Sequence, residues 1–273
     1  MTAFICMTCG VQYAEAESAP AHCAICEEER QYINAKGQRW TTLAELRASH
    51  RNRIVEHEPG LTGIGSEPEF AIGQRALLVH GAGSPPAAGV LWDCISLVDD
   101  ASAKAVRALG SVRAIAISHP HFYSSMIEWS RALGGVPVYL HAADRQWVMR
   151  PDPAIHFWEG ETHELGDGLT LIRCGGHFAG STALHWAAGA EGRGALLTAD
   201  TLTVVSDARY VSFMYSYPNL IPLPRPAIEQ IVRSVDPFTF DRIYGGWWER
   251  QVPADAKAAV SRSAERYIKA IGG

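Results

Sequence analysis

The chain has 273 residues, of which 47% are apolar and 19% charged, and its formal net charge is −5. This composition is ordinary for a folded globular protein, and the length suffices for one large α/β domain or two smaller ones. The acidic balance provides no overall basic field that would attract nucleic acid or anionic lipid. No secretory signal opens the sequence and no long apolar run predicts a membrane span, so we expect a cytoplasmic protein.

Four of the six cysteines come first in the chain, as Cys6-x2-Cys9 and Cys23-x2-Cys26. Two such pairs at this separation are typical of a tetrahedral four-thiolate zinc site. Two disulfides are the alternative, but without a secretion signal the spacing favours zinc. A closed four-sulfur site leaves no position for substrate, so this zinc is expected to be structural. We therefore predict a zinc ribbon over residues 1–35, docked against the main domain or a second copy of the chain.

The next segment, residues 36–65, is expected to link the ribbon to the main domain. TTLAELRASHRN, residues 41–52, predicts a helix in this linker, and EPGLTGIGSEP, residues 58–68, predicts a loop at the domain boundary.

From residue 66 onward, short apolar segments alternate with amphipathic ones, which predicts a layered α/β domain over residues 66–273. Strands are expected over 74–81, 89–96, 112–118, 136–141, 169–174, 182–188, 194–200 and 241–246. Helices are expected over 100–110, 123–134, 227–235 and 253–271.

Five polar side chains stand at the ends of these predicted strands or just after them. They are Asp93, His119, His121, His177 and Asp200. Strand ends that open on one edge of a sheet can converge in space, and loops there carry chemistry on a rigid scaffold. The repeated placement of imidazole and carboxylate groups therefore predicts a site for a divalent metal ion.

The segments VLWDC, SHPH, GGHFAGS and LLTAD, in this order, resemble the metallo-β-lactamase superfamily over roughly residues 66–250. The resemblance implies an α/β (α+β) fold, a four-layer αββα sandwich with a metal site along one edge of the packed sheets. It implies that His119, His121 and His177 bind one metal ion. Asp200 then corresponds to the carboxylate that usually bridges two metals, and Asp93 to a supporting residue near the site.

The motif His-x-His-x-Asp-His of that superfamily reads here as His119-Pro-His121-Phe-Tyr123-Ser, and no histidine follows residue 185. The ligands of a second metal are therefore missing, and a mononuclear site is expected. Zinc bound there would activate water to attack an ester, thioester or lactone carbonyl, with Asp200 as a ligand or base. Tyr123 either stabilises an oxyanion in place of the second metal or packs in the core.

The segment SFMYSYPNLIPLP, residues 212–224, is rich in proline and aromatic residues and predicts a long irregular loop. Tyr215 and Tyr217 in this loop, together with Phe122 and Trp247, predict a pocket partly walled by aromatic rings. Such a pocket suits a small-molecule substrate with an apolar or planar part. The alternative is that the rings only fill the space left by the missing ligands.

Two other functions fit the same residues. Histidines and a carboxylate can also bind mononuclear iron, which would support oxygen chemistry. Alternatively, a degraded site and a zinc ribbon could belong to a binding or scaffold protein. The acidic segments EAES and CEEER in the ribbon argue against nucleic acid as its partner, because they repel phosphate.

Overall fold

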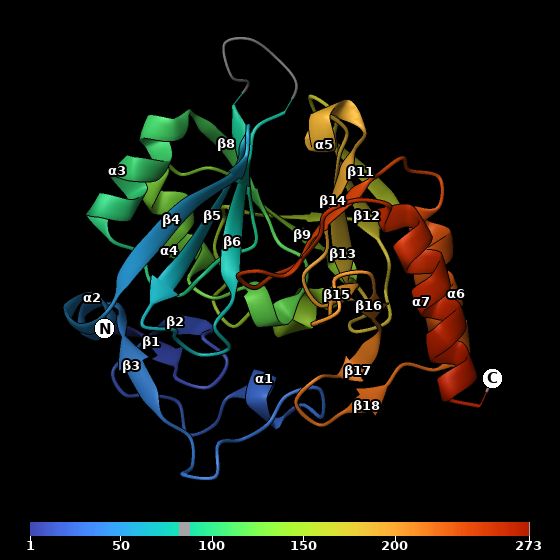
Figure 1. Ribbon diagram of the computed structural model, residues 1–273. Helices are drawn as coiled ribbons and strands as arrows, with labels where there is room; N and C mark the ends of the chain where they lie inside the picture. Colours follow the sequence, from blue (N-terminus) through green and yellow to red (C-terminus); the bar gives the residue numbers. More distant parts are fainter. Residues whose placement is uncertain (82–87, 273) are drawn as a thin grey trace.

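The computed structural model describes residues 1–81 and 88–272. Its main body is two β-sheets packed face to face with helices on both outer sides (Figure 1), the αββα arrangement expected from the sequence. The ribbon lies below the two sheets in this view, on the same side as β17 and β18.

The first sheet has seven strands in the order β10-β9-β8-β7-β6-β5-β4. Strands β4 to β7 pair antiparallel, whereas β7 to β10 pair parallel. Its elements are β4 Arg51–Glu58, β5 Leu61–Glu67, β6 Arg75–Val79, β7 Gly89–Trp92, β8 Val112–Ala116, β9 Val138–His141 and β10 Ile155–Trp158. Helices α3 Asp100–Leu109 and α4 Met126–Ala132 cover its outer face (Figure 1), and the 3-10 helices η1 Pro120–Phe122 and η2 Ala142–Trp147 follow β8 and β9.

The second sheet has six strands in the order β11-β12-β13-β14-β19-β20, and only its β14–β19 pair is parallel. Its strands are β11 Thr162–Gly166, β12 Leu169–Arg173, β13 Thr182–Trp186, β14 Ala195–Leu197, β19 Arg242–Tyr244 and β20 Gln251–Val252. Helices α6 Arg225–Val235 and α7 Ala256–Ala270 cover its outer face, and α5 Gly189–Gly192 follows β13 (Figure 1). Two small hairpins, β15 Thr203–Val204 with β16 Val211–Ser212 and β17 Met214–Ser216 with β18 Ile221–Pro222, lie between β14 and α6.

The alternation of side chains along the strands creates three apolar layers. In β6, Leu77 and Val79 point into the layer between the two sheets, while Ala76 and Leu78 face the α3 and α4 side. Likewise, Leu197 of β14 lies between the sheets. Because both faces of these strands are covered, they consist of almost continuous apolar residues.

The ribbon is a three-stranded sheet in the order β2-β1-β3 with a short helix. Its elements are β1 Thr2–Cys6, β2 Gln12–Ala16, α1 Ala24–Glu27 and β3 Trp40–Thr42, followed by α2 Leu43–Ser49. A capping box between Thr42 and Glu45 begins α2. Because β3 pairs with β1, the ribbon sheet extends beyond the predicted limit at residue 35.

The largest difference from the sequence prediction concerns residues 51–67. The segment predicted as linker and loop forms the antiparallel pair β4–β5, which adds two strands to the first sheet. Its glycines are the reason that a loop was expected. Gly63 and Gly65 instead lie beneath the Trp248 ring, whose atoms would come within 3.0 and 2.7 Å of an added Cβ. Glycine here allows an aromatic ring to approach the strand closely.

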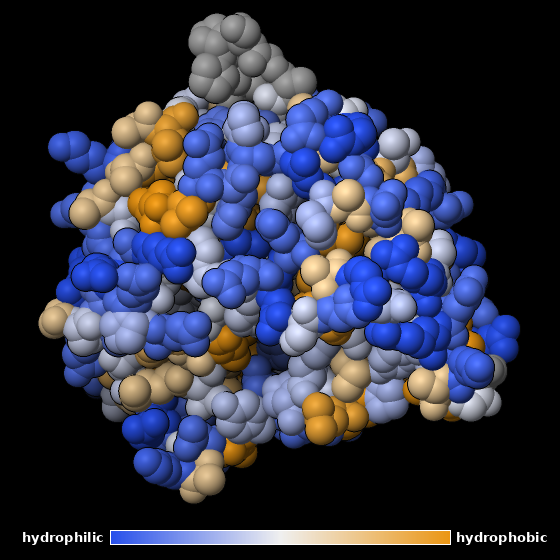
Figure 2. Space-filling view, viewed as in Figure 1, coloured by the Kyte–Doolittle hydropathy of each residue, from blue (hydrophilic) through white to orange (hydrophobic). Residues whose placement is uncertain are grey.

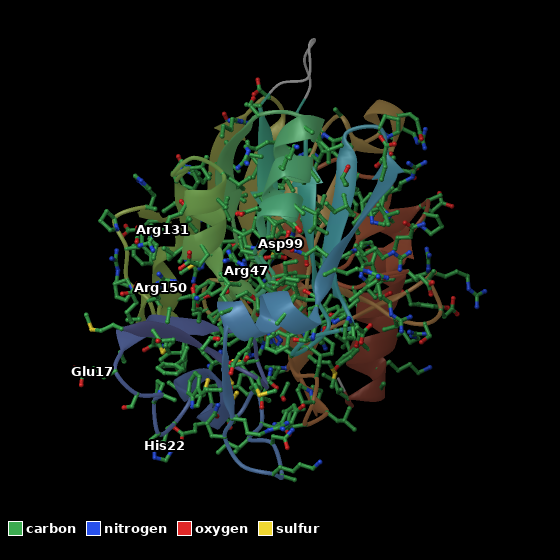
Figure 3. The ribbon with its side chains drawn as sticks, turned by 90° about the vertical axis from the view of Figure 1, so that its left-hand side faces the viewer. Glu17, His22, Arg47, Asp99, Arg131 and Arg150 are labelled. Atoms are coloured by element: carbon green, nitrogen blue, oxygen red, sulfur yellow. The ribbon has the colours of Figure 1, made fainter. Side chains whose placement is uncertain are left out.

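Residue 150 illustrates how the ribbon is attached to the main domain. Arg150 forms an ion pair with Glu128 of α4 at 2.7 Å and lies 3.8 Å from Glu15 of the ribbon. Figure 3 shows it directly beside the ribbon strands. Cys6, Cys9 and the other ribbon cysteines share one apolar cluster with residues of the main domain, so the ribbon docks within the chain.

The surface seen in Figure 2 is largely hydrophilic, with apolar residues in small separate groups. In the part of the chain that the structure describes, no helix combines the length and apolar character needed to cross a bilayer.

Candidate metal centres

Strand ends bring together the three predicted histidines and one carboxylate. His119 and His121 follow β8, His177 follows β12, and Asp200 follows β14. The four residues are each 5% exposed or less, and one ligand atom from each lies within 4.8 Å of all the others. Two sheets therefore contribute ligands to one buried point at the edge of the sandwich.

The distances fit a single bound ion. Asp200 Oδ2 lies 3.3 Å from His119 Nε2, 4.0 Å from His121 Nδ1 and 3.8 Å from His177 Nε2. The buried His119 Nε2 has no hydrogen-bond partner among the described residues. A buried polar atom without a partner is costly, and a metal ion between these groups would satisfy it.

Contacts on the far side of the rings fix their orientation. His177 Nδ1 donates a hydrogen bond to the carbonyl oxygen of Tyr215 at 2.8 Å. His119 Nδ1 lies 2.9 Å from Ser118 Oγ. Such partners hold the proton on one ring nitrogen and leave the other free to bind a metal.

The shifted pKa values of His119, His177 and Asp200 favour the protonation states that bind a metal ion. Burial lowers the pKa of His119 to about 4 and moves that of His177 well below its ordinary value, so both imidazoles are neutral at pH 7. Burial opposes ionisation of Asp200, but the His119 and His121 imidazoles beside it outweigh burial and hold the pKa of this carboxyl below its usual range. Neutral imidazoles and an ionised carboxylate are the species that bind divalent ions.

Asp93 supports the site without joining the ligand group. Its Oδ1 accepts a hydrogen bond from the backbone N–H of Ser118 at 2.8 Å, one residue before His119. Its backbone has a φ of 62°, and burial raises the pKa of its carboxyl to about 8. The contact fixes the turn that carries His119, which agrees with the supporting position implied by the sequence resemblance.

The candidate site opens into a cavity of about 330 Å³. It is lined by Gln31, Ile72, His121, His177, Asp200, Thr203, Val204, Tyr217, Pro218, Trp247 and Arg250. Tyr217 and Trp247 thus lie where the sequence places them, and the Tyr217 hydroxyl donates to the carbonyl oxygen of Asp200 at 3.0 Å. Phe122 is fully buried and packs between His119 and Trp247, with ring centroids 5.1 and 5.7 Å away.

Two predicted residues do not reach the cavity. Tyr123 is buried in a crevice with Val11 and Gln12 of the ribbon, because η1 directs Phe122 rather than Tyr123 toward His119. An oxyanion contact from Tyr123 is therefore not what this geometry provides. The Tyr215 side chain points to the ribbon, where its hydroxyl donates to Glu29, and only its backbone carbonyl meets His177.

Among the residues near the site that were not predicted, three have long polar side chains. Gln31 and Arg250 line the cavity, and Arg30 donates to the carbonyl oxygen of His177 at 3.0 Å. The Arg30 guanidinium also stacks 4.0 Å above the Phe178 ring. No local pattern marks these side chains, because only the docking of the ribbon and the turn before β20 bring them to the cavity.

The ribbon segment that carries Arg30 and Gln31 is tied to the hairpin β17–β18. The Asn219 side chain donates to the carbonyl oxygens of Glu29 and Gln31, both at 2.9 Å, and Ser216 Oγ donates to that of Arg30 at 3.1 Å. These side chains belong to the segment 212–224. The segment expected to be a long irregular loop therefore contains the hairpin β17–β18, which is hydrogen-bonded to the ribbon.

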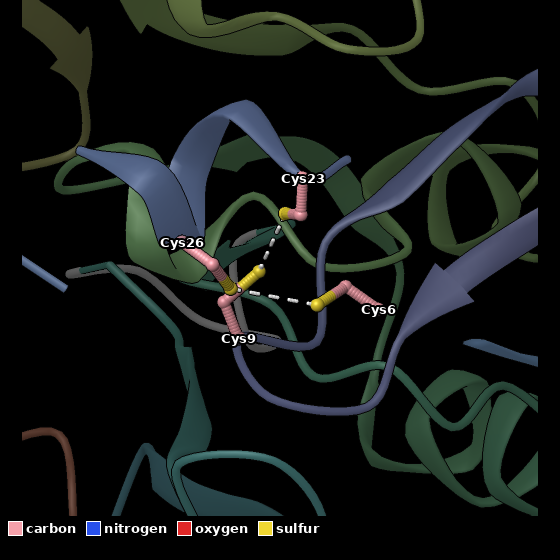
Figure 4. Close-up of side chains that lie close together, drawn as sticks. All are labelled: Cys6, Cys9, Cys23 and Cys26. Atoms are coloured by element: carbon pink, nitrogen blue, oxygen red, sulfur yellow. Dashed lines mark hydrogen bonds between the residues drawn. The ribbon is translucent and has the colours of Figure 1, made fainter. Parts of the chain in front are cut away.

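The four ribbon cysteines form the second candidate centre (Figure 4). Cys6 Sγ lies 3.5 Å from Cys26 Sγ, and Cys9 Sγ lies 3.6 Å from Cys23 Sγ. All four thiols are buried and free, at separations well beyond the 2.05 Å or so of a disulfide bond. The four thiols could therefore bind one metal ion.

Comparison with known proteins supports the fold and identifies a relative. No family model matches the chain. The uncharacterized protein YmaE of Bacillus subtilis (strain 168) is 48% identical over 273 residues, which covers 99% of this chain and 97% of YmaE. A relative this similar over the whole chain shares its fold and its family.

Solved metallo-β-lactamase structures share the architecture. VMB-1 superimposes with a TM-score of 0.59 at 12% identity, over 81% of this chain and 99% of its own. The metallo-β-lactamase DIM-1 superimposes with a TM-score of 0.58 at 13% identity, and the shares of the two chains are the same as for VMB-1. FIM-1 from Pseudomonas aeruginosa, in its mono-zinc form, superimposes with a TM-score of 0.55 at 12% identity, over 79% of this chain and 95% of its own. The chain therefore belongs to the same family as YmaE, with the metallo-β-lactamase fold and a four-cysteine ribbon ahead of it.

Proposed function

We propose that the chain is a metal-dependent hydrolase with one catalytic ion, zinc, which acts on an ester, thioester or lactone carbonyl. The supporting observation is a group of four buried ligand atoms, within 4.8 Å of one another, at the wall of a cavity of about 330 Å³. Zinc bound by His119, His121, His177 and Asp200 would lower the pKa of a bound water to about 7 and so make it a nucleophile at neutral pH.

The protein side chains hold Asp200 in position and shape the cavity in which the substrate would bind. Asp200 is held from both sides, since its carbonyl oxygen accepts from Tyr217 and its Oδ1 lies 3.3 Å from Thr203 Oγ1. It can act as a ligand or orient the attacking water as a base. Hydrolysis then adds the hydroxyl of water to the carbonyl carbon and its proton to the leaving alcohol or thiol. Ile72, Val204 and Trp247 provide an apolar wall that excludes bulk water.

A single ion is proposed because the described residues offer only two such ligand groups, the four cysteines and the three histidines with Asp200. Tyr123 stands where the superfamily motif has a carboxylate, and it faces the ribbon. The described cavity wall contains no further histidine, cysteine or carboxylate that would serve as a ligand of a second zinc ion.

Metal content and hydrolysis test the proposal together. Protein purified without added metal is expected to contain two zinc ions per chain, and His177→Ala one. Hydrolysis of 4-nitrophenyl acetate, a thioester and a γ-lactone by His177→Ala should fall at least about 100-fold. His185→Gln is the matched control, because His185 is a buried histidine whose Nε2 contacts the carbonyl oxygen of Thr239 at 2.8 Å, away from the cavity.

The opposite outcomes are equally clear. One zinc per chain in both the wild type and His177→Ala would mean that only the ribbon binds metal, and the hydrolase proposal fails. Stoichiometric iron in the main site would contradict the zinc hydrolase and favour iron-dependent oxygen chemistry instead.

A further inference from the structure

One charged side chain of the cavity wall has no partner among the described residues. Arg250 lines the cavity, and its guanidinium forms no hydrogen bond or ion pair with any described side chain or carbonyl. We propose that Arg250 binds the substrate, and that the substrate is a small carboxylic acid.

The charge of the cavity wall supports an anionic ligand. Asp200 is the sole carboxylate among the lining residues, and it is turned toward the three histidines. Arg250 therefore adds a positive charge that no acidic side chain of the wall offsets. A guanidinium presents paired N–H donors whose geometry matches a carboxylate, which makes arginine a specific receptor for this group.

The backbone of Arg250 is fixed although its side chain is free. Its carbonyl oxygen accepts from the N–H of Gly245 at 2.8 Å, at the turn that leads into β20. A Cβ on Gly245 would lie 3.2 Å from the Arg250 Cβ, so the turn is tight. The guanidinium is thus presented from a rigid element, which reduces the entropy lost when a ligand binds.

Gln31 places part of the ribbon in the cavity wall. Its backbone carbonyl oxygen accepts from the Asn219 side chain, which holds this stretch of the ribbon against the hairpin β17–β18. Apolar and aromatic neighbours such as Ile72, Tyr217 and Trp247 suit a planar or apolar part of the substrate beside its carboxylate.

Calorimetric titration with hippurate and its neutral amide, hippuramide, tests this inference. Hippurate combines a carboxylate with a planar ring, and hippuramide carries a neutral amide in place of the carboxylate. The wild type should bind hippurate at least about tenfold more tightly than hippuramide. Arg250→Gln should remove that preference. Arg209→Gln, which alters an exposed arginine paired with Asp207, should leave it unchanged.

The inference rests on the proposed function only in taking this cavity as the substrate site, so the two can fail separately. Hippurate binding that depends on Arg250, in a protein that hydrolyses no ester, would support this inference and contradict the hydrolase. Equal affinity of the wild type for hippurate and hippuramide would overturn the inference. So would hippurate binding that survives Arg250→Gln but is lost in His177→Ala, because the carboxylate would then bind at the metal centre.

Discussion

The two candidate metal centres are both groups of four buried ligands, but they depend on the fold in opposite ways. The cysteines belong to the ribbon, where Cys6 ends β1 and Cys26 lies in α1, and this three-stranded sheet is too small to build its own core. The histidines and Asp200 instead follow the ends of strands in a large sandwich. In a ribbon, metal binding supplies much of the folding free energy. In the sandwich, three apolar layers hold the four candidate ligands in place, so folding of this domain does not need the ion.

The largest expected effect is on the ribbon. Cys23→Ser should remove one metal ion per chain and lower the free energy of unfolding by about 3 kcal/mol or more, because a structural zinc contributes directly to stability. Guanidinium unfolding and metal analysis measure both. Cys174→Ser is the control, as Cys174 is a buried free thiol outside either centre. Unchanged stability with both metals retained would show that Cys23 is not a ligand.

A smaller effect, on the metal affinity of the main site, is expected from Arg30, which joins the ribbon to the main domain. Arg30→Ala removes the hydrogen bond to the carbonyl oxygen of His177 and the contact with Phe178. Loss of such outer contacts typically weakens metal affinity 10- to 100-fold, so the main site should lose affinity about tenfold while the ribbon keeps its metal. Competition with a chelator measures each site. If Arg39→Ala, which changes an exposed ribbon residue, has the same effect, the contact is not the cause.

The smallest expected effect is a pH dependence of the free energy of unfolding, caused by Asp144, which contacts the loop that carries His177. Asp144 Oδ1 accepts from the N–H of Gly180 at 2.9 Å, and burial raises the pKa of Asp144 to about 6. Between about pH 4 and 6 the folded state then holds a proton that the unfolded state has lost, so the free energy of unfolding falls as pH rises. Asp144→Asn should remove this dependence, and gain on the order of 1 kcal/mol relative to the wild type from pH 4.5 to 7.

Urea unfolding at several pH values tests that expectation. Parallel stability profiles for Asp144→Asn and the wild type would contradict a raised pKa at this position.

The fold and the ligand positions were accessible from sequence because they follow from local patterns. Buried strands read as apolar runs, and His119, His177 and Asp200 stand directly at their ends. The strands β4 and β5 were missed because their glycines predict a loop. In the structure, Gly63 and Gly65 lie within β5 and leave room for the Trp248 ring. Tyr123 was placed by its position in a motif, yet a single 3-10 turn decides which way it faces.

The residues that shape the cavity could not be found in this way. Gln31 and Arg250 are polar residues without a motif, and their proximity depends on how the ribbon and the last turn of the second sheet dock. Contacts between such distant segments are set by the complete tertiary structure rather than by local sequence.

The tie between Asn219 and the ribbon also has a consequence for the order in which the protein forms. The cavity wall combines Gln31 with Arg250, so a chain emerging from the ribosome has made all four ligands of the main site well before the wall can close. Domains generally fold as synthesis proceeds, from the first residues onward. The cavity wall can therefore be completed only after synthesis has passed Arg250.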